Sequence, residues 1–341
     1  MVTDIYQHIQ QGLTTKRDNI TDFLESATEA EKDTCCCEDE EGVQTHLQVI
    51  ETALERVEDQ SLGLCEVCHG YVDSSLLEMD YTSSVCLDHY SDEERRRLEA
   101  ELELSQIVQR ALLPQRMPAI AGVELAAFSR PSEIIGGDYF DFFQYRDGSY
   151  GFVIADVSGH GVSAGMLMSS LQTALRTMAP GSDSPAEILE RINHFYIHNI
   201  NFTTFVTVFL ARYDPATRAL TYVNSGHNPP AVFRKRERAV VWLVRTAAAI
   251  GLMEEFHPQT ETVVLSDGDA LLLYTDGVTE THNSKAEQFG EERLAGLLLQ
   301  NADLSAPNLI QVLRTALVEF SNGQPLADDT TVIALRVSNG A

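Results

Sequence analysis

Five aspartates stand beside apolar, strand-like runs in the second half of the sequence. Asp138 closes the turn GGD, Asp156 is expected to end the strand GFVIA, and Asp276 is expected to end the strand LLLYT. Asp328 and Asp329 directly precede the run TTVIAL. One aspartate after a strand is typical of a turn cap, but the repetition favours a site for hard cations, Mg²⁺ or Mn²⁺. Two such ions close together would polarise a phosphoryl oxygen and generate a hydroxide nucleophile, so the pattern predicts phosphoryl chemistry.

A second constellation lies near the N-terminus. Cys65 and Cys68 form a C-x-x-C pair, and Cys86 and His89 form a pair of the same spacing after a gap of 17 residues. Three thiolates and one imidazole would complete a tetrahedral shell, which predicts a structural zinc site rather than a catalytic one. His69 directly follows Cys68 and breaks the paired spacing, so we favour His89 as the fourth ligand. The alternative is a set of reduced core cysteines beside a surface histidine.

The overall charge restricts the function classes. The chain has 341 residues and a net charge of −27, which disfavours direct nucleic-acid binding and attachment to anionic membrane surfaces. No apolar run approaches the roughly 18 residues of a membrane-spanning helix, and the sequence begins without a secretory signal pattern. We therefore expect a cytoplasmic protein with reduced cysteines.

Charge and cysteines divide the chain. Residues 1–100 carry 24 acidic and 7 basic side chains and all six cysteines. This bias predicts an N-terminal domain over residues 1–90, a linker or coupling helix over 91–117, and a second domain over 118–341. Apolar spacing predicts helices at 3–31 and 43–60, which would form a hairpin with its tip near 33–42. Cys35, Cys36 and Cys37 lie at that tip, where a redox or metal sensor competes with an incidental exposed tract.

The helix expected over 91–113 joins the two domains. Ser91 and Glu94 have the spacing of a capping box, and Pro114 would end the helix. Leu98 and Leu102 belong to an apolar stripe along one side. We expect this helix to couple the domains and to pair with its counterpart in a homodimer; the alternative is a passive spacer.

From residue 118 onward the pattern changes to ten short β-like runs with frequent hairpin spacing. Four helical stretches are expected at 163–177, 185–199, 290–301 and 306–321. Strands outnumber helices and do not alternate with them regularly, which predicts an α+β fold with antiparallel sheets.

The stretch LQVIETALERVEDQSLGLCEVCHG, continuing to VCLDHY, resembles the DksA/TraR family. The resemblance implies a helical hairpin followed by a zinc finger with the same 17-residue gap. His89 stands where the family usually has a cysteine, and the family's acidic D-x-x-D-x-A tip motif is absent. A binding protein of the transcription machinery, with RNA polymerase as its partner, is the alternative function that this resemblance implies.

The second half resembles the SpoIIE/RsbU branch of the metal-dependent PPM phosphatases. Its landmarks occur in one order: ALLPQRMP, SEIIGGDYFDFF, VIADVSGHGVSAGMLMS, TTFVTVFLARYD, YVNSGHNPP, YTDGVTE and DDTTVIAL. The resemblance implies a sandwich of two antiparallel sheets flanked by helices. It also implies a serine/threonine phosphatase of bacterial signalling, acting on a phosphorylated anti-anti-sigma (STAS) protein and regulated by the zinc-finger domain.

The same resemblance assigns roles to residues. Asp156 would bridge two Mg²⁺ or Mn²⁺ ions, with the Val157 carbonyl and Asp138 on one ion and Asp276 and Asp328 on the other.

Other positions have two readings. Asp329 is a further candidate ligand. Asp141 would either support the ligands or lie exposed on its strand. His160 is expected to pack in its loop rather than to act as a general acid, and His227 to stabilise a turn. Gly159 and Gly161 suit a loop that needs a positive φ.

Overall fold

The computed structural model describes residues 10, 13–14, 17, 21, 40–59, 61–72, 85–132, 134–159, 161–182, 184–199, 205–324 and 328–338. The chain divides into two compact units, and the boundary between them falls between Glu101 and Leu102. None of the helices in these described ranges is long and apolar enough to cross a membrane.

The N-terminal unit contains the predicted second helix as α3, Glu40–Glu58. Its stripe is buried at Ile50 and Leu54, which pack with Leu13 and Leu62 in a small core. Of the predicted helix 3–31, the few described residues are helical. Most of that helix, most of the predicted hairpin tip, and Cys35, Cys36 and Cys37 lie outside the described residues.

Helix α5, Asp92–Leu112, begins in the N-terminal unit and ends in the second one. Its capping box forms as predicted: the Ser91 N–H donates to Glu94 Oε2 at 2.8 Å, and the Glu94 N–H donates to Ser91 Oγ at 3.3 Å. The helix ends two residues before Pro114, and none of its residues is buried. Within the described part of the chain, its apolar residues Leu98, Leu104, Ile107 and Val108 are exposed, whereas Leu102 and Leu112 are partly buried.

The second unit contains two five-stranded sheets in which every strand pair is antiparallel. One has the order β1-β10-β9-β6-β7, with β1 Val123–Arg130, β6 Ala231–Arg234, β7 Ala239–Trp242, β9 Ala270–Tyr274 and β10 Thr330–Val337. The other has the order β2-β3-β4-β5-β8, with β2 Tyr139–Gln144, β3 Tyr150–Val157, β4 Val206–Asp214, β5 Ala219–Ser225 and β8 Glu261–Val264. All ten predicted runs are strands, and the predicted α+β class is confirmed.

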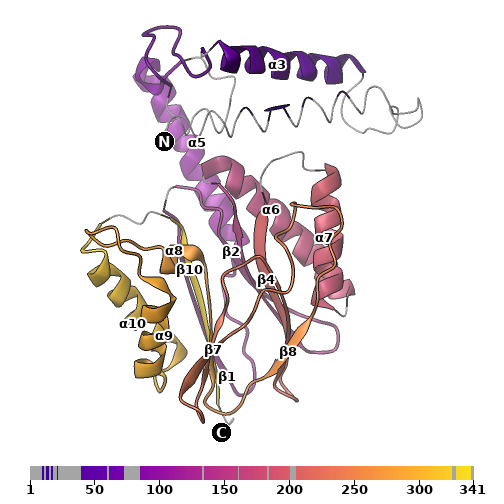
Figure 1. Ribbon diagram of the computed structural model, residues 1–341, viewed down its shortest axis with the longest axis vertical. Helices are drawn as coiled ribbons and strands as arrows, with labels where there is room; N and C mark the ends of the chain where they lie inside the picture. The colour runs from indigo at the N-terminus through magenta and orange to yellow at the C-terminus, as the bar shows by residue number, and fades with distance from the viewer. Residues whose placement is uncertain are drawn as a thin grey trace. The chain divides into compact units, whose positions relative to one another are not determined.

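The sheets pack face to face between two layers of helices (Figure 1). Helices α6 (Gly161–Met178) and α7 (Pro185–Asn199) pack on the sheet that contains β3. Helices α9 (Gly290–Asn301) and α10 (Ala306–Phe320) pack on the sheet that contains β1. Alternate residues along the central strands fill the core between the sheets, and the intervening residues face the helices. This four-layer arrangement matches the predicted sandwich.

The expectation that Asp141 lies exposed on its strand is wrong. Its side chain is fully buried on the face of β2 that packs on α6. The Arg176 guanidinium from α6 donates to both carboxylate oxygens, and the Tyr139 hydroxyl donates to Oδ2 at 2.7 Å. Asp141 therefore ties a helix to its sheet.

Replacing Asp141 with asparagine is expected to lower the free energy of unfolding by about 2–3 kcal/mol, because it leaves Arg176 without its charge partner. This expected loss of stability is smaller than for a fully buried ion pair, because the Arg176 side chain is 45% exposed. Urea titration measures the change. Asp147→Asn, which disrupts a more exposed ion pair with Arg212, should cost less than about 1 kcal/mol. Equal losses in the two variants would contradict the assignment.

Candidate active site

Four of the predicted aspartates converge at one edge of the sandwich: Asp138, Asp156, Asp276 and Asp328, called the aspartate cluster below. Asp138 directly precedes β2, and the register pairs Tyr139 with Ala155, so Asp138 comes beside Asp156 at the end of β3. In the other sheet, the end of β9 meets the start of β10, since Tyr274 pairs with Val332. The antiparallel pairing of strands in the two sheets therefore places these aspartates at the same edge.

Asp276 differs locally from the prediction. It does not end a strand but begins α8, a four-residue helix over Asp276–Thr279. Its Oδ1 atom is buried and accepts no hydrogen bond from the residues that the structure describes. Such an orphaned carboxylate oxygen is costly in a protein interior unless a cation or another partner meets it.

The carboxylates repel one another's charge. Burial, followed by the charges of Asp276, Asp328 and neighbouring carboxylates, raises the pKa of Asp156 to about 8. Burial and then Asp328 raise the pKa of Asp276 to about 6. For Asp138, burial and then Asp156 raise the pKa well above its ordinary value. Because burial and mutual repulsion disfavour the ionised carboxylates, a bound cation would stabilise them.

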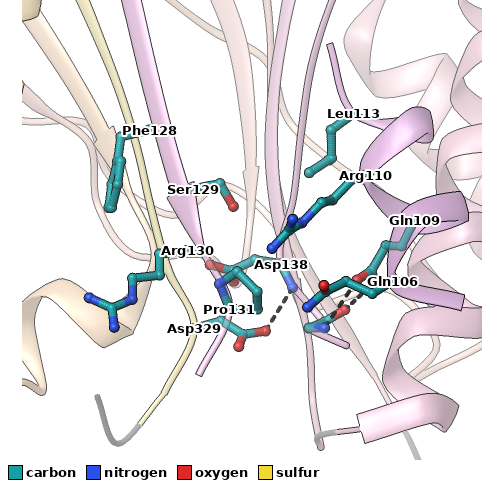
Figure 2. Close-up of a pocket in the computed structure, with 11 residues that line it drawn as sticks. Gln106, Gln109, Arg110, Leu113, Phe128, Ser129, Arg130, Pro131, Asp138 and Asp329 are labelled. Atoms are coloured by element: carbon teal, nitrogen blue, oxygen red, sulfur yellow. Dashed lines mark hydrogen bonds between the residues drawn. The ribbon is translucent and has the colours of Figure 1, made fainter. Parts of the chain in front are cut away.

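A short loop presents Asp138, and Asp329 holds that loop. Asp329 Oδ1 accepts hydrogen bonds from the Ser132 N–H at 2.7 Å and the Ser132 hydroxyl at 3.0 Å. Its Oδ2 accepts one from the Gly137 N–H at 2.7 Å. Figure 2 shows Asp329 next to Asp138. The prediction that Asp329 is also a metal ligand stays a prediction.

Two further contacts place oxygen atoms at the site. The Thr275 hydroxyl donates to Asp138 Oδ2 at 2.8 Å. A Cβ atom on Gly137 would lie 2.9 Å from the Val157 carbonyl oxygen, so that carbonyl closely faces the loop. The Val157 carbonyl and the aspartate cluster thus form a donor set of oxygens alone, which suits Mg²⁺ or Mn²⁺ rather than zinc.

Helix α5 also holds the loop, a feature that sequence reasoning missed. The Gln109 side chain donates to the Gly136 carbonyl at 2.6 Å and accepts from the Gly136 N–H at 3.2 Å. The Gln106 side chain donates to the Ile134 carbonyl at 2.8 Å. Figure 2 shows both glutamines reaching from the helix to the loop. The sequence gives no chemical signal for them, because glutamines on a polar helix face are common.

Glu280 is a second missed residue. It directly follows α8, and its charge is among the causes that raise the pKa values of Asp156 and Asp276. Its position in YTDGVTE, four residues after Asp276, was the available signal. One helical turn brings residues four apart to the same side.

The predicted histidines take no part in the cluster that the structure describes. His227 is buried. Its backbone N–H donates to Asn224 Oδ1 at 2.9 Å, and its ring Nδ1 lies 2.8 Å from the Thr207 hydroxyl oxygen. These contacts agree with a turn-stabilising role. His160 lies outside the described residues. Its neighbours Gly159 and Gly161 have φ values of 100° and 73°, as predicted.

Gly277 lets α8 approach the start of β10. A Cβ atom at this position would overlap the Asp329 backbone carbonyl, which cannot move without displacing Asp328. We expect Gly277→Ala to lower kcat/KM more than tenfold and to weaken Mn²⁺ binding, measured by steady-state kinetics and calorimetry. Gly296→Ala is the matched control, because its Cβ would meet nothing within 4 Å on α9. Wild-type kinetics in Gly277→Ala would show that the close approach is not needed.

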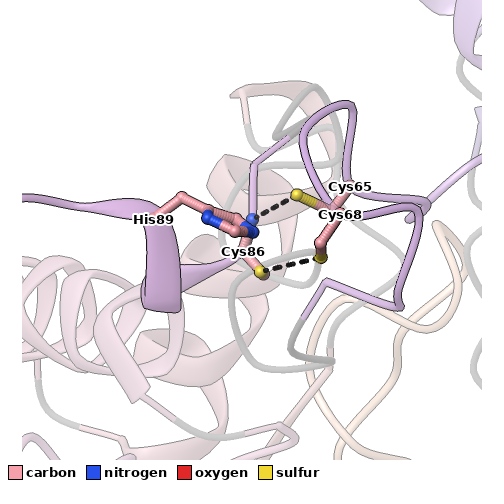
Figure 3. Close-up of side chains that lie close together, drawn as sticks. All are labelled: Cys65, Cys68, Cys86 and His89. Carbon is pink, nitrogen blue, oxygen red and sulfur yellow. Dashed lines mark hydrogen bonds between the residues drawn. The ribbon is translucent and has the colours of Figure 1, made fainter.

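The N-terminal unit contains the second predicted constellation. Ligand atoms of Cys65, Cys68, Cys86 and His89 all lie within 4.8 Å of one another. Figure 3 shows the four side chains close together. The Cys86 N–H donates to Cys65 Sγ and the Gly70 N–H to Cys68 Sγ, each at 3.4 Å. Burial opposes ionisation of Cys65, but N–H donors led by that of Cys86 lower its pKa to about 6. The four side chains can therefore serve together as metal ligands.

Known proteins are similar in sequence to much of this chain. The family model described as stage II sporulation protein E (SpoIIE) matches residues 146–338, more than half of the chain. Phosphoserine phosphatase RsbU of Bacillus subtilis (strain 168) is 27% identical over 244 residues, which cover 71% of this chain and 71% of RsbU. Phosphoserine phosphatase RsbP of the same strain is 26% identical, over 70% of this chain and 58% of RsbP.

A solved structure agrees with the fold. The SiaA-PP2C domain of Pseudomonas aeruginosa superposes with a TM-score of 0.65 at 24% identity, over 72% of this chain and 99% of that domain. Its two-sheet architecture is the one described above. From the family match and the aspartate cluster together, this chain belongs to the stage II sporulation protein E (SpoIIE) family and is a protein phosphatase.

Proposed function

We propose that the enzyme hydrolyses phosphoserine or phosphothreonine in a signalling protein, using two Mg²⁺ or Mn²⁺ ions held by the aspartate cluster and the Val157 carbonyl. The observation that carries this is the buried Oδ1 of Asp276, which has no hydrogen-bond partner among the described residues and lies among carboxylates that raise one another's pKa. Bound there, the ions would supply Lewis acidity toward phosphoryl oxygens and lower the pKa of a coordinated water.

The protein's own residues hold this site in place. Asp156 stands between Asp138 in its own sheet and Asp276 at the end of the other sheet, which suits the bridging position. Asp329 and Gln109 hold the Asp138 loop from two sides, and the Thr275 hydroxyl orients the Asp138 carboxylate. These hydrogen bonds come from the protein's own residues, and they fix the positions of the oxygen atoms that would hold the ions.

The test is hydrolysis of p-nitrophenyl phosphate and of a phosphoserine peptide by the full chain. We expect turnover with Mn²⁺ or Mg²⁺, its loss with a chelator, and its recovery when the ion is restored. Turnover that persists after complete chelation would contradict the metal-dependent mechanism. The absence of turnover with either ion would contradict the activity.

For the substrate, we propose a phosphorylated STAS-domain protein, by resemblance to the SpoIIE/RsbU branch. The Asp276→Asn variant should bind but not turn over the substrate, and so retain it in a pull-down. Retention of phosphorylated STAS proteins over their unphosphorylated forms is expected; equal retention of both would contradict the proposal.

For the N-terminal unit, we propose a zinc-bound, DksA/TraR-like regulatory domain. The four clustered ligands support the zinc. RNA polymerase as a partner rests on the hairpin tip, most of which lies outside the described residues, and stays a prediction.

Helix α5 is proposed as the coupler and as a homodimer contact. Leu98 is 38% exposed and Ile107 is 64% exposed, while Gln106 and Gln109 on the same helix hold the Asp138 loop. We expect the double substitution Leu98→Asp and Leu102→Asp to convert a dimer to a monomer in light scattering and to change phosphatase activity. If the double variant remains a dimer with unchanged activity, the coupling role of α5 is contradicted and the helix is a passive spacer.

A further inference from the structure

A pocket of about 330 Å³ opens directly beside Asp138 and Asp329. One wall is α5, with Gln106, Gln109 and Arg110, and the opposite wall is the end of β1. A phosphorylated substrate must bring its negative charge to this edge of the molecule, where carboxylates are concentrated. Bound cations would offset part of that repulsion; a basic side chain in the pocket would offset more.

Arg110 is placed for this task. Figure 2 shows the Arg110 side chain extending from α5 into the pocket toward Asp138, whereas Arg130, the other arginine that lines the pocket, extends away from Asp138. Arg110 is exposed and forms no ion pair with any residue in the ranges that the structure describes. Its guanidinium is therefore not paired with the carboxylate of Asp138 or Asp329, although both residues line the same pocket.

The backbone under Arg110 is fixed relative to the aspartates. The preceding residue, Gln109, forms two hydrogen bonds with Gly136, two residues before Asp138 in the chain. The helix and the loop thus move together. A planar guanidinium can donate two parallel N–H bonds to phosphoryl oxygens, a geometry that an ammonium group does not reproduce.

We propose that Arg110 binds the phosphoryl oxygens of the substrate and of the inorganic phosphate product. This rests on the proposed function for the identity of the reaction, and it adds a substrate contact from outside the two sheets. Since α5 begins in the N-terminal unit, phosphate recognition and interdomain coupling would share one helix.

The experiment compares wild type, Arg110→Met, Arg110→Lys and the control Arg96→Met, an exposed arginine nearer the start of the same helix. Inorganic phosphate is titrated into the Mg²⁺-loaded full-length proteins by calorimetry, and its inhibition constant and the KM for a phosphoserine peptide are measured. For Arg110→Met we expect phosphate binding to weaken and KM to rise by about 10- to 100-fold, the size of a lost charge-assisted contact. Arg110→Lys should have a phosphate affinity and a KM between those of wild type and Arg110→Met. Arg96→Met should match wild type in both.

A separate Mn²⁺ titration excludes an indirect effect. Removing a nearby positive charge should leave Mn²⁺ affinity unchanged or tighter, whereas a residue that merely supports the loop would weaken it when removed. Unchanged phosphate affinity in Arg110→Met, weakened Mn²⁺ binding, or no phosphate binding by wild type would each overturn the proposal. If wild type binds phosphate through Arg110 but turns over no phosphoester, the proposed function fails while the phosphate contact stands.

Discussion

Asp156→Asn is expected to abolish phosphatase turnover while the fold survives. Asp156 stands at the centre of the aspartate cluster, where its pKa is raised by burial and by the carboxylates around it. A neutral amide in its place cannot bridge two cations or offset their mutual repulsion. We expect less than a tenth of the wild-type kcat with p-nitrophenyl phosphate at saturating Mn²⁺.

Stability separates this effect from misfolding. Because the neutral amide would relieve charge repulsion in the metal-free protein, the metal-free variant should unfold at a temperature no lower than wild type. Asp267→Asn, an exposed aspartate in the turn before β9, is the matched control and should retain full activity. If Asp156→Asn retains more than a tenth of the wild-type kcat, the assignment of Asp156 as the bridging ligand is contradicted.

Removing zinc from the N-terminal unit is expected to unfold that unit and leave the second unit folded. Small metal domains take much of their folding free energy from the ion, of order 10 kcal/mol apparent. The core beside this site is small, with Cys65, Val72 and Cys86 as its buried members. It has little other apolar burial to replace the contribution of the metal.

Elemental analysis of the purified full chain should give close to one zinc per chain. Cys65→Ser should lose the zinc and the protease resistance of residues 61–90, while melting of the second unit is unchanged. Cys36→Ser, a cysteine outside both spaced pairs, is the control and should keep both. A metal-free protein with an intact, protease-resistant N-terminal unit would contradict the structural zinc site.

The sequence alone predicted the ten strands and most of the described helices, and it indicated the candidate ligands. Short β-like runs mark the ten strands, and the stripe on α3 and the Ser91–Glu94 box on α5 mark helices, because each of these signals acts over a few neighbouring residues. The paired cysteine spacing is equally local, and it correctly brought four metal-ligand side chains together. The order of motifs around the aspartates indicated the fold class and the family.

Other features were decided only by packing between distant segments. The sequence could not choose between the two expectations for Asp141, because the face of β2 that meets α6 depends on how the sheet is covered. In the structure it pairs with Arg176, 35 residues away. The prediction that Asp276 ends a strand missed α8, a single turn whose position depends on the close approach of Gly277 to Asp329.

The supports of the site are the clearest case. Gln109 and Gly136 are 27 residues apart, and Asp329 and Ser132 are 197 apart. Such contacts follow from strand order and register in two sheets, which no local pattern encodes. The sequence by itself therefore identified candidate metal ligands. Only the tertiary structure decided which residues hold them in position and that Arg110 lines the pocket beside them.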